Sequence, residues 1–566
     1  MYWTTEIIIS LLIVLASLAV LAPRVPIPFP IVLVLSGILL GCIPGLSGIT
    51  LNPDLVFLFF LPPLLYRAAA FTSWPEFRAN LRPIMSLAVG LVLVTTFAVA
   101  AVAHSIIHGL PWSAALVLGA IVSPPDAVAT TTILKRLGVP RRLVTILEGE
   151  SLVNDATGLV LYRLAIAATM TGAFSLSEAA LSFPVVGLGG VLIGLAMGWI
   201  VVQVRHRVEN PSAEITLSLL TPFAAYLPAE GLDLSGVLAM VAAGLYVGRH
   251  LPRIASTASR LQAYAVWDTV DFLLNGLVFL LIGLQLPVIL AGARISQPLP
   301  EMLWHAALIS GVAIVVRLLW VFPAAHIPRV LSPRLRHRDP VPPWQQLLVA
   351  GWSGMCGVVS MAAALALPLS TGSGASFPQR DVIVFLSFCV ILATLVLQGL
   401  SLPALIRWLR VADDGAANDR EAEARLKAAQ AGLKRLETLN ADIGLPDDLI
   451  ERLRAPYTDR IHHFSVRQGR THDGAWARTQ ADHRYLQREA LEAERATILE
   501  LWDQGEINDD VQRRIQRDLD LEESRLMSSK KTKQLLALAS APGTVSGAAA
   551  TSGDAPSPRA SRNGEQ

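Results

Sequence analysis

TILEGESLVNDATGLVLYRLA, residues 145–165, is a hydrophobic stretch that carries several charged and polar side chains. It is long enough to cross a bilayer as a helix, which takes about 20 residues. Glu150, Asn154 and Asp155 nevertheless fall inside it. An ionisable group at the bilayer centre costs roughly 2.5–3.5 kcal/mol on insertion scales. Such groups therefore indicate function more strongly than surface charges do.

The spacing of these side chains brings oxygen atoms together on a helix. Ser151 and Asp155 are four positions apart and share one face, and Glu150 and Asn154 share the adjoining face. Carboxylate, amide and hydroxyl oxygens are hard ligands that suit Na+, Li+ or K+, and no soft ligand for a transition metal is near. Structural pairing between helices is the alternative interpretation.

A second apolar run, AALVLGAIVSPPDAVATTTILKRLG at residues 114–138, is interrupted midway by Pro124 and Pro125, and Asp126 follows at once. Proline removes a backbone donor and clashes with the preceding turn, which frees carbonyl groups near the middle of the membrane. Transporters use broken helices of this kind to coordinate ions. The alternative is a kinked helix with Asp126 as the cap of its second half, and the two roles can coexist.

A third run, LLVAGWSGMCGVVSMAAALALP at residues 347–368, has Gly351, Gly354 and Gly357 at its middle. Interrupted segments in matching positions of two halves point to the binding site of an inverted-repeat transporter. The proline-interrupted run and this glycine-rich run fit as such a pair. A glycine face for close helix packing is the other interpretation.

Two further groups of charges need an explanation. Arg317 lies in an apolar run, and a buried guanidinium needs a carboxylate partner. Glu150 is the natural candidate, which would make both residues structural. Asp268, Asp271 and Asn275 form one stripe on another expected helix, where the acids could line a funnel that attracts cations. Ordinary charges at a helix end would look the same.

Composition sets the class of protein. Of 566 residues, 53% are hydrophobic and 16% are charged, whereas soluble domains carry about 25% charged residues. We expect an all-α membrane domain at 1–410, a cytoplasmic helical tail at 411–540 and a disordered low-complexity end at 541–566. The net charge of +2 gives no case for nucleic acid, and the three cysteines show no metal-ligand spacing.

Thirteen membrane-spanning helices are predicted from the apolar runs. Basic residues gather in every second loop, which places the N-terminus outside and the C-terminus inside under the positive-inside rule. The expected spans start near Glu6, Ile31, Asp54, Ile84, Trp112, Val144, Pro184, Ile215, Leu234, Trp267, Met302, Gln346 and Val382.

Five segments resemble the signatures of the monovalent cation:proton antiporter-1 family, which includes the NhaP-type prokaryotic exchangers and the animal sodium/proton exchangers. They are SPPDAVA, LEGESLVNDATGLVLYRLA, FLLNGLVFLLIGLQLP, GWSGMCGVVSMAAALALP and TLVLQGLSLPALIRWL. The resemblance covers roughly residues 10–410, and its most specific part is Glu150 to Asp155.

The resemblance implies a thirteen-helix, inverted-repeat antiporter with a dimer domain and a moving core domain, in the inner membrane and as a homodimer. It implies that Asp155 binds the cation and protons in alternation, that Asp126 lies beside it and that Ser151 contributes a ligand. Asn154 takes the place that a second aspartate has in electrogenic relatives, which suggests electroneutral exchange.

Glu150 and Arg317 match the buried ion pair of this family, but two positions depart from its pattern. Cys356 stands where many relatives have arginine, which bears on local electrostatics and on the pH response. Several relatives have an acidic residue near Arg67, so an accessory carboxylate on the cation path is not carried over here.

The function expected from these residues is exchange of Na+ or Li+ for H+ through competition at Asp155, in the service of pH and sodium homeostasis. The protein is not expected to be an enzyme, to hold a resident metal or to need a cofactor. A K+/H+ antiporter, a cation channel and a polytopic membrane enzyme are the alternatives. The enzyme would need a nucleophile–base pair or a metal site, and the membrane domain has neither His-Glu-x-x-His nor clustered histidines.

Overall fold

The structure is a computed structural model that describes residues 2–24, 27–43, 56–171, 176–208, 210–293, 298–371, 374–412, 416–443, 446–467, 487, 489–501, 504 and 509–527. These residues are almost entirely helical, and no strand occurs among them beyond one isolated bridge between Ser370 and Ser376. The chain forms two compact units, Met1–Asp414 and Gly415–Gln566.

The first half of the membrane unit runs from α1 to α10. A π-helix, Val56–Phe60, leads directly into α4, and a second one, Ser86–Leu91, joins α6 to α7. The helices are α1 (Tyr2–Leu21), α2 (Phe29–Gly41), α4 (Leu61–Ala70), α5 (Trp74–Ala79), α6 (Leu81–Met85), α7 (Val92–Ile106), α8 (Trp112–Val122), α9 (Ala127–Leu137) and α10 (Arg141–Thr171).

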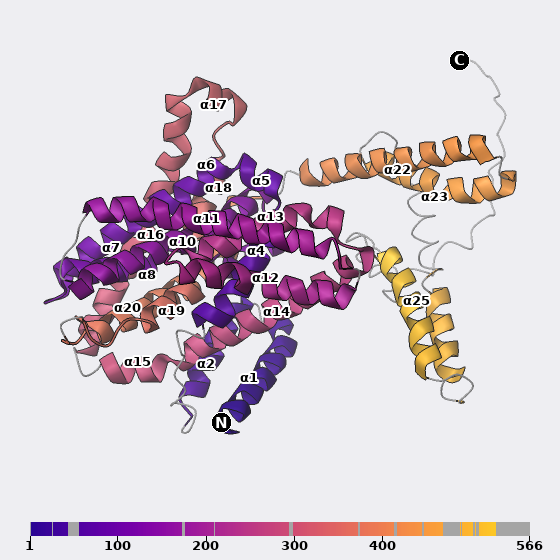
Figure 1. The fold of residues 1–566 in the computed structure, drawn as a ribbon. Helices are drawn as coiled ribbons and strands as arrows, with labels where there is room; N and C mark the ends of the chain where they lie inside the picture. The colour runs from indigo at the N-terminus through magenta and orange to yellow at the C-terminus, as the bar shows by residue number, and fades with distance from the viewer. Residues whose placement is uncertain are drawn as a thin grey trace, which may run out of the picture. The chain divides into compact units, whose positions relative to one another are not determined.

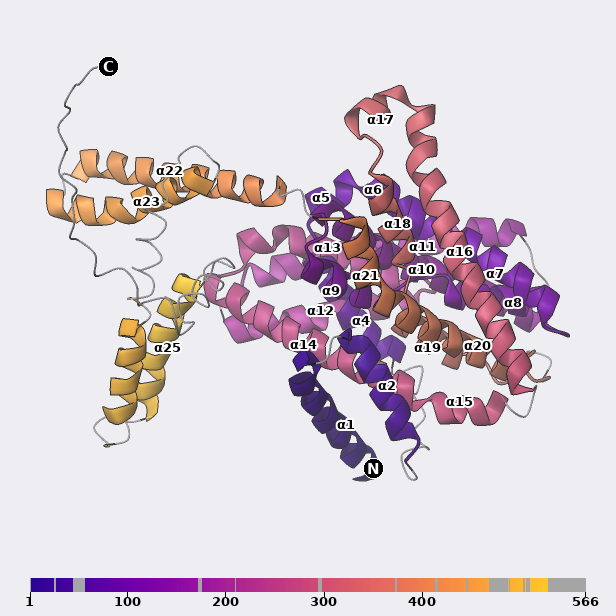
Figure 2. The same cartoon turned by 180° about the vertical axis from the view of Figure 1, so that it is seen from behind.

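The second half contains the longest described helix, of 33 residues, and a third π-helix, η4 (Thr394–Gln398). Its α-helices are α11 (Leu176–Arg205), α12 (Pro211–Gly231), α13 (Gly236–Ile254), α14 (Thr257–Leu284), α15 (Leu286–Ala293), α16 (Leu299–Leu331), α17 (Pro333–Arg338), α18 (Trp344–Trp352), α19 (Val358–Leu365), α20 (Arg380–Ala393) and α21 (Gly399–Leu409). Figure 2 shows α16 running beside α18 and α20.

Apolar helices long enough to cross a membrane confirm a polytopic all-α membrane protein. Five such helices occur in the described part of the chain: Leu81–Ile106, Pro184–Arg205, Ser259–Gly292, Leu299–Leu331 and Arg380–Leu409. Shorter apolar helices include Phe29–Gly41 and Trp112–Val122. The broken helices account for some of the short pieces, and the count of thirteen spans stays a prediction.

Helix α10, which carries most of the polar residues predicted to act, lies in the middle of the membrane unit (Figure 1). It contacts α8, α9, α18 and α19. Gly158 permits the close approach to the proline break, because a Cβ at this position would lie 2.9 Å from Pro124 Cγ. The fold therefore places the polar stretch against both interrupted runs.

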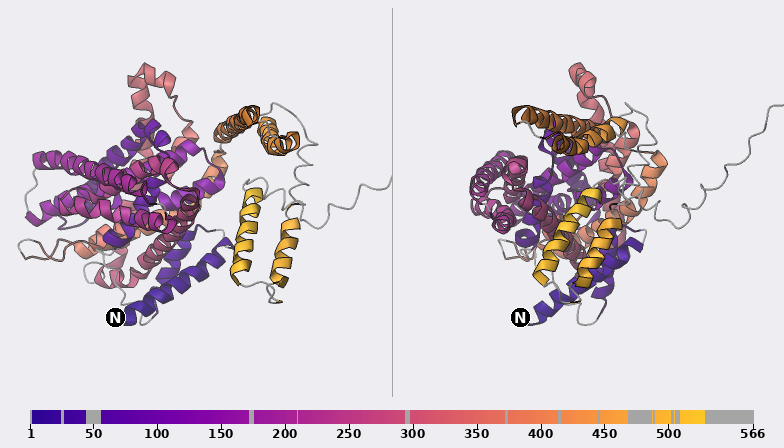
Figure 3. Two further views of the ribbon diagram at one scale, coloured as in Figure 1. Left: turned by 45° about the vertical axis from the view of Figure 1, so that its right-hand side comes forward. Right: turned by 90° about the vertical axis from the view of Figure 1, so that its right-hand side faces the viewer.

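The second unit consists of helical hairpins. Helices α22 (Ala416–Ile443) and α23 (Asp447–Arg467) pack together, and helix 489–501 lies beside α25 (Asp509–Met527) (Figure 3). Arg495 joins the second pair through ion pairs with Asp520 and with Glu523, the latter at 2.6 Å. The composition of the tail predicts charged helices near 418–440 and 475–505. The first lies within α22, whereas part of the second, and all of 541–566, lie outside the described residues.

Candidate ion-binding site

Two interrupted helices meet at one point of the membrane unit. Helix α8 ends at Val122 and α9 begins at Ala127, whereas α18 ends at Trp352 and α19 begins at Val358. Both predicted interruptions are thereby confirmed. The backbone N–H of Asp126 in the first break donates to the carbonyl of Met355 in the second at 2.7 Å. The two breaks thus satisfy part of each other's unpaired backbone.

Asp126 caps α9 and also faces α19. Its Oδ1 accepts a hydrogen bond from the N–H of Val128 at 2.8 Å, and the N–H of Val358 also donates to its carboxylate. The carboxylate packs directly against Gly357, where an added Cβ would collide with Asp126 Oδ2. The carboxylate therefore lies at the N-termini of two helices, where the helix dipole favours negative charge.

Asn154 and Asp155 of α10 line the same junction. Asn154 is completely buried, and its Nδ2 donates to the carbonyl of Pro125 at 2.9 Å. Its Oδ1 is buried and has no hydrogen-bond partner among the described residues. A buried oxygen without a donor costs free energy unless another group or an ion satisfies it.

Asp155 is 5% exposed and makes no hydrogen bond or ion pair with any residue that the structure describes. It is close enough to Asp126 for the two carboxylates to interact electrostatically. Ser151, half-buried, lies one turn earlier on the same face of α10. Four oxygen-bearing side chains predicted to bind the ion therefore come from the first break and from α10, as the spacing indicated.

A buried ion pair flanks this junction. Both carboxylate oxygens of Glu150 accept from Arg317, at 2.5 Å and 2.9 Å, and Arg317 Nε also donates to the carbonyl of Ala350 at 3.3 Å. Arg317 packs over Gly354, where an added Cβ would collide with Arg317 Cδ. The pair connects α10, α16 and α18, and each charge has its complement.

Cys356 also joins the two breaks. Its thiol donates to the carbonyl of Val122 at 3.3 Å, and its N–H donates to Thr394 Oγ1 at 3.1 Å. A cavity of about 20 Å³ adjoins Cys356, Ser123 and Arg317, which is room for about one water molecule. The thiol thus pairs a carbonyl that the end of α8 leaves without a helical partner.

Asp268 and Asp271 of α14 are held by Arg67 of α4. Arg67 Nη2 lies 2.6 Å from Asp268 Oδ1, and Nη1 lies 3.0 Å from Asp271 Oδ2. Asn275 Nδ2 donates to the other oxygen of Asp271 at 2.9 Å. The sequence did not reveal this pairing, because Arg67 and Asp268 are 201 positions apart and Arg67 is one of the basic residues that the topology prediction assigns to a loop.

A second buried ion pair was missed as well. Arg205 of α11 and Glu214 of α12 lie 2.9 Å apart, with side chains 2% and 3% exposed. Arg205 is one of the basic loop residues on which the topology prediction rests. The short connection between the two helices is the signal that could have suggested it. This pair lies outside the junction of the broken helices. It connects α11 with α12, and we interpret it as structural.

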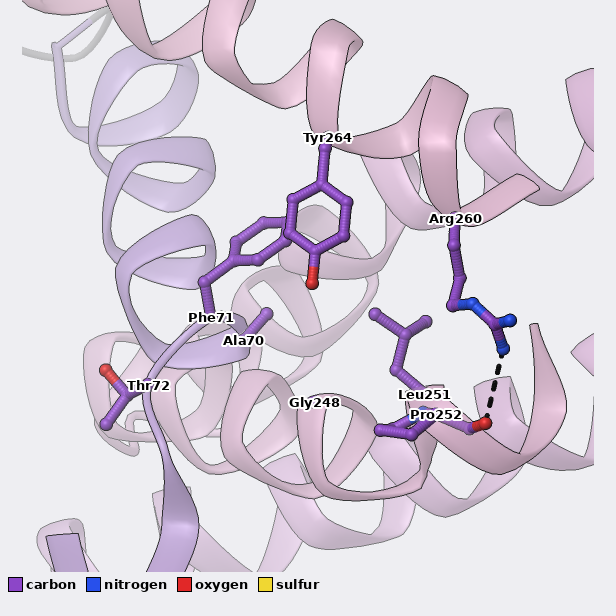
Figure 4. Close-up of a pocket in the computed structure, with 8 residues that line it drawn as sticks. All are labelled: Ala70, Phe71, Thr72, Gly248, Leu251, Pro252, Arg260 and Tyr264. Carbon is purple, nitrogen blue, oxygen red and sulfur yellow. Dashed lines mark hydrogen bonds between the residues drawn. The ribbon is translucent and has the colours of Figure 1, made fainter. Parts of the chain in front are cut away.

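A more open pocket of about 460 Å³ lies at the ends of α4, α13 and α14 (Figure 4). It is lined by Ala70, Phe71, Thr72, Gly248, Leu251, Pro252, Arg260 and Tyr264. Figure 4 shows Arg260 turned toward the carbonyl of Pro252, to which it donates a hydrogen bond at 3.3 Å. No carboxylate is among these lining residues, so its chemistry does not suit a cation.

Comparison with known proteins defines the class. Residues 8–408 match the family model described as sodium/hydrogen exchanger, transmembrane. The chain belongs to this family of membrane transporters.

Particular relatives share much of the chain. An uncharacterized Na(+)/H(+) exchanger of Mycobacterium tuberculosis is 39% identical over 537 residues, 92% of this chain and 96% of that protein. A sodium, potassium, lithium and rubidium/H(+) antiporter of Bacillus pumilus is 35% identical over 420 residues, 71% of this chain and 61% of that protein. The sodium proton antiporter MjNhaP1 of Methanocaldococcus jannaschii shares the fold, with a TM-score of 0.57 at 19% identity over 72% of this chain and 98% of that one.

Proposed function

We propose that this chain exchanges Na+ for H+ across the inner membrane, with the carboxylate of Asp155 as the group that both ions bind in turn. The observation that carries the proposal is that Asp155 is buried with no hydrogen bond or ion pair to the residues that the structure describes. It lies beside a second carboxylate, at the junction of two broken helices. Membership in the sodium/hydrogen exchanger family supports Na+ and H+ as the transported ions.

Coupling follows from the cost of moving a bare charge through a medium of low dielectric constant. An unneutralised carboxylate is strongly disfavoured there. The site can therefore change sides when Asp155 carries a proton or a Na+, but not when it carries neither. Because the two ions compete for one group, inward flow of one is tied to outward flow of the other.

Oxygen ligands for the cation are available at the junction. Asp155 supplies a carboxylate, Asn154 Oδ1 is buried without a hydrogen-bond partner in the described part, and Ser151 follows the same face of α10. Asp126 stays charged in this scheme because two helix N-termini stabilise it. With Asn154 neutral, only Asp155 changes its partner, which supports exchange of one cation for one proton.

The remaining parts of the proposal concern setting and assembly. The alternation of basic loops supports thirteen spans with the N-terminus outside and the tail in the cytoplasm. The resemblance supports a homodimer in a lipid bilayer and a role in pH and sodium homeostasis. The catalytic chemistry of an enzyme is not needed to explain any of the paired or unpaired charges.

The test is transport in everted membrane vesicles from a host without its own Na+/H+ antiporters. Respiration acidifies the vesicles, a pH-sensitive dye reports the gradient, and Na+ is then added. We expect Na+ to dissipate the gradient in wild type and not in Asp155→Asn. Asp381→Asn, the same chemical change at a half-exposed carboxylate outside the site, should behave as wild type. Exchange that persists in Asp155→Asn would refute the role of Asp155.

K+/H+ exchange is the second candidate, favoured by the Bacillus pumilus relative whose name includes potassium, lithium and rubidium. Oxygen ligands alone do not separate Na+ from K+. Adding K+ or Li+ in place of Na+ to the same vesicles decides between them. A gradient that collapses with K+ at lower concentration than with Na+ would make the protein a K+/H+ antiporter.

A further inference from the structure

Arg67 of α4 is paired with both acidic residues of α14, Asp268 and Asp271, which we call the acidic pair. Its guanidinium spans both carboxylates, at 2.6 Å from Asp268 and 3.0 Å from Asp271. Its Cζ also lies 5.9 Å from the centre of the Phe71 ring, which packs against Tyr264 at 5.0 Å between centroids (Figure 4). The Arg67 side chain is 29% exposed.

The guanidinium is held incompletely. Its Nε is buried and has no hydrogen-bond partner among the residues that the structure describes. An unpaired buried donor weakens the association, because its lost hydration is not replaced. One arginine also leaves the trio of Arg67, Asp268 and Asp271 with a net charge of −1, since two carboxylates face one guanidinium. Another cation can therefore compete for these carboxylates.

The acidic pair is electrically connected to the ion-binding junction. Asp271 interacts with Asp126 through space, and Lys135 of α9 interacts with Asp271. Helix α14 contacts α19 as well as α4. Lys135 is itself paired with Glu148 at 2.6 Å, so its charge is largely compensated locally. Arg67 is thus the cation placed on the carboxylates nearest to Asp126 on α14.

We propose that Arg67 is a tethered competitor of the transported cation at Asp268 and Asp271, and that it thereby sets the apparent cation affinity of the antiporter. The proposal rests on the proposed function. Arg67 does not bind the transported ion and acts only through the two carboxylates. By lowering the negative potential around these two carboxylates, it raises the cation concentration needed for half-maximal exchange.

Removal of the charge should change affinity and leave turnover intact. Arg67→Gln keeps a long polar side chain but loses the charge, and we expect KM for Na+ to fall about three- to tenfold, as expected for one charge a few ångströms from the path in a partly aqueous medium. Vmax should stay within about twofold of wild type. Arg67→Lys keeps a tethered charge and should restore most of the wild-type KM.

The experiment measures Na+-dependent dissipation of the gradient in everted vesicles for wild type, Arg67→Gln, Arg67→Lys and Arg67→Gln/Asp271→Asn. The double variant removes one charge of each sign and should return KM toward wild type. Arg260→Gln is the matched control, because Arg260 is a nearby arginine that donates to the backbone carbonyls of Pro252 and Ala255. Its KM should not change. The Arg67→Gln shift should also shrink when choline chloride is added, because salt screens the charge.

Two results would overturn the inference. An unchanged KM in well-folded Arg67→Gln would mean that Arg67 does not compete with the ion. A lower Vmax that Lys does not rescue would make Arg67 a structural bridge between α4 and α14. Wild type and Asp155→Asn in the same preparation test the proposed function separately, so failure of one is not mistaken for failure of the other.

Discussion

Glu150 and Asp155 are two buried carboxylates on one helix, five positions apart, and their surroundings differ in charge. Glu150 is 1% exposed and accepts hydrogen bonds from both Nη atoms of Arg317. Asp155 is hardly more exposed, and among the described residues its electrostatic neighbour is another carboxylate, that of Asp126. The same helix thus carries one acid with an ion-pair partner and one acid without such a partner among the described residues.

The difference separates a structural charge from a working one. A buried ion pair with complementary geometry holds helices together, because removing one partner strands the other charge. A lone buried carboxylate contributes nothing of this kind and is disfavoured until a proton or a cation arrives. The comparison therefore predicts that loss of Glu150 harms stability, whereas loss of Asp155 harms transport alone.

The largest effect is expected from breaking the buried pair. Glu150→Gln leaves the guanidinium of Arg317 buried without its counter-charge, and we expect a loss of about 3–5 kcal/mol of stability. Asp155→Asn removes an uncompensated charge and should leave stability equal or higher. Thermal unfolding of the two purified variants in detergent measures this: the midpoint should fall by several degrees in the first and not in the second.

The double variant Glu150→Gln/Arg317→Met is the control for this prediction. It removes both charges, so it should recover much of the stability that Glu150→Gln loses. If Asp155→Asn were destabilised as much as Glu150→Gln, Asp155 would have a structural role and the contrast between the two acids would disappear.

A medium effect is expected where Asp126 meets the second break. Gly357→Ala places a Cβ against the Asp126 carboxylate, which must then move away from the N-terminus of α19. Overpacking of this kind costs about 1–3 kcal/mol, and we expect the antiport rate to fall severalfold because the carboxylate is displaced. Gly311→Ala is the matched control in α16, since a Cβ there meets no atom within 4 Å. Equal rates in the two variants would show that the position of Asp126 does not matter.

The sequence was most informative where charge is costly. In apolar runs with few ionisable groups, Glu150 and Arg317 could be paired across 167 positions, because each needs an opposite charge. Prolines and glycines likewise predicted both interruptions, since they disturb a helix for local reasons. Such reasoning works when a residue's own chemistry limits the number of arrangements that it can adopt.

The sequence was least informative where charge is ordinary. Arg67 is one of the basic residues that the topology prediction assigns to a loop. Its contact with Asp268 and Asp271 depends on how α4 packs against α14. The three π-helices are also invisible to a 3.6-residue periodicity, because each changes the register by a single residue. These features depend on tertiary packing and need coordinates.

The smallest effect concerns Cys356, which lines a small cavity together with Arg317 of the buried pair. Its thiol donates to the carbonyl of Val122 at 3.3 Å, so Cys356→Ala leaves that carbonyl unpaired at a cost of about 1 kcal/mol. Cys356→Ser keeps a donor at this position and should retain stability. Because Cys356 makes no side-chain hydrogen bond to Asp155 or Asp126 in the described part of the chain, both variants should keep a KM close to wild type. Thermal midpoints and Na+ dependence in vesicles check this together. If Cys356→Ser lowers the thermal midpoint as much as Cys356→Ala, the thiol acts by filling space and not by its hydrogen bond. If either variant shifts KM, Cys356 affects cation binding.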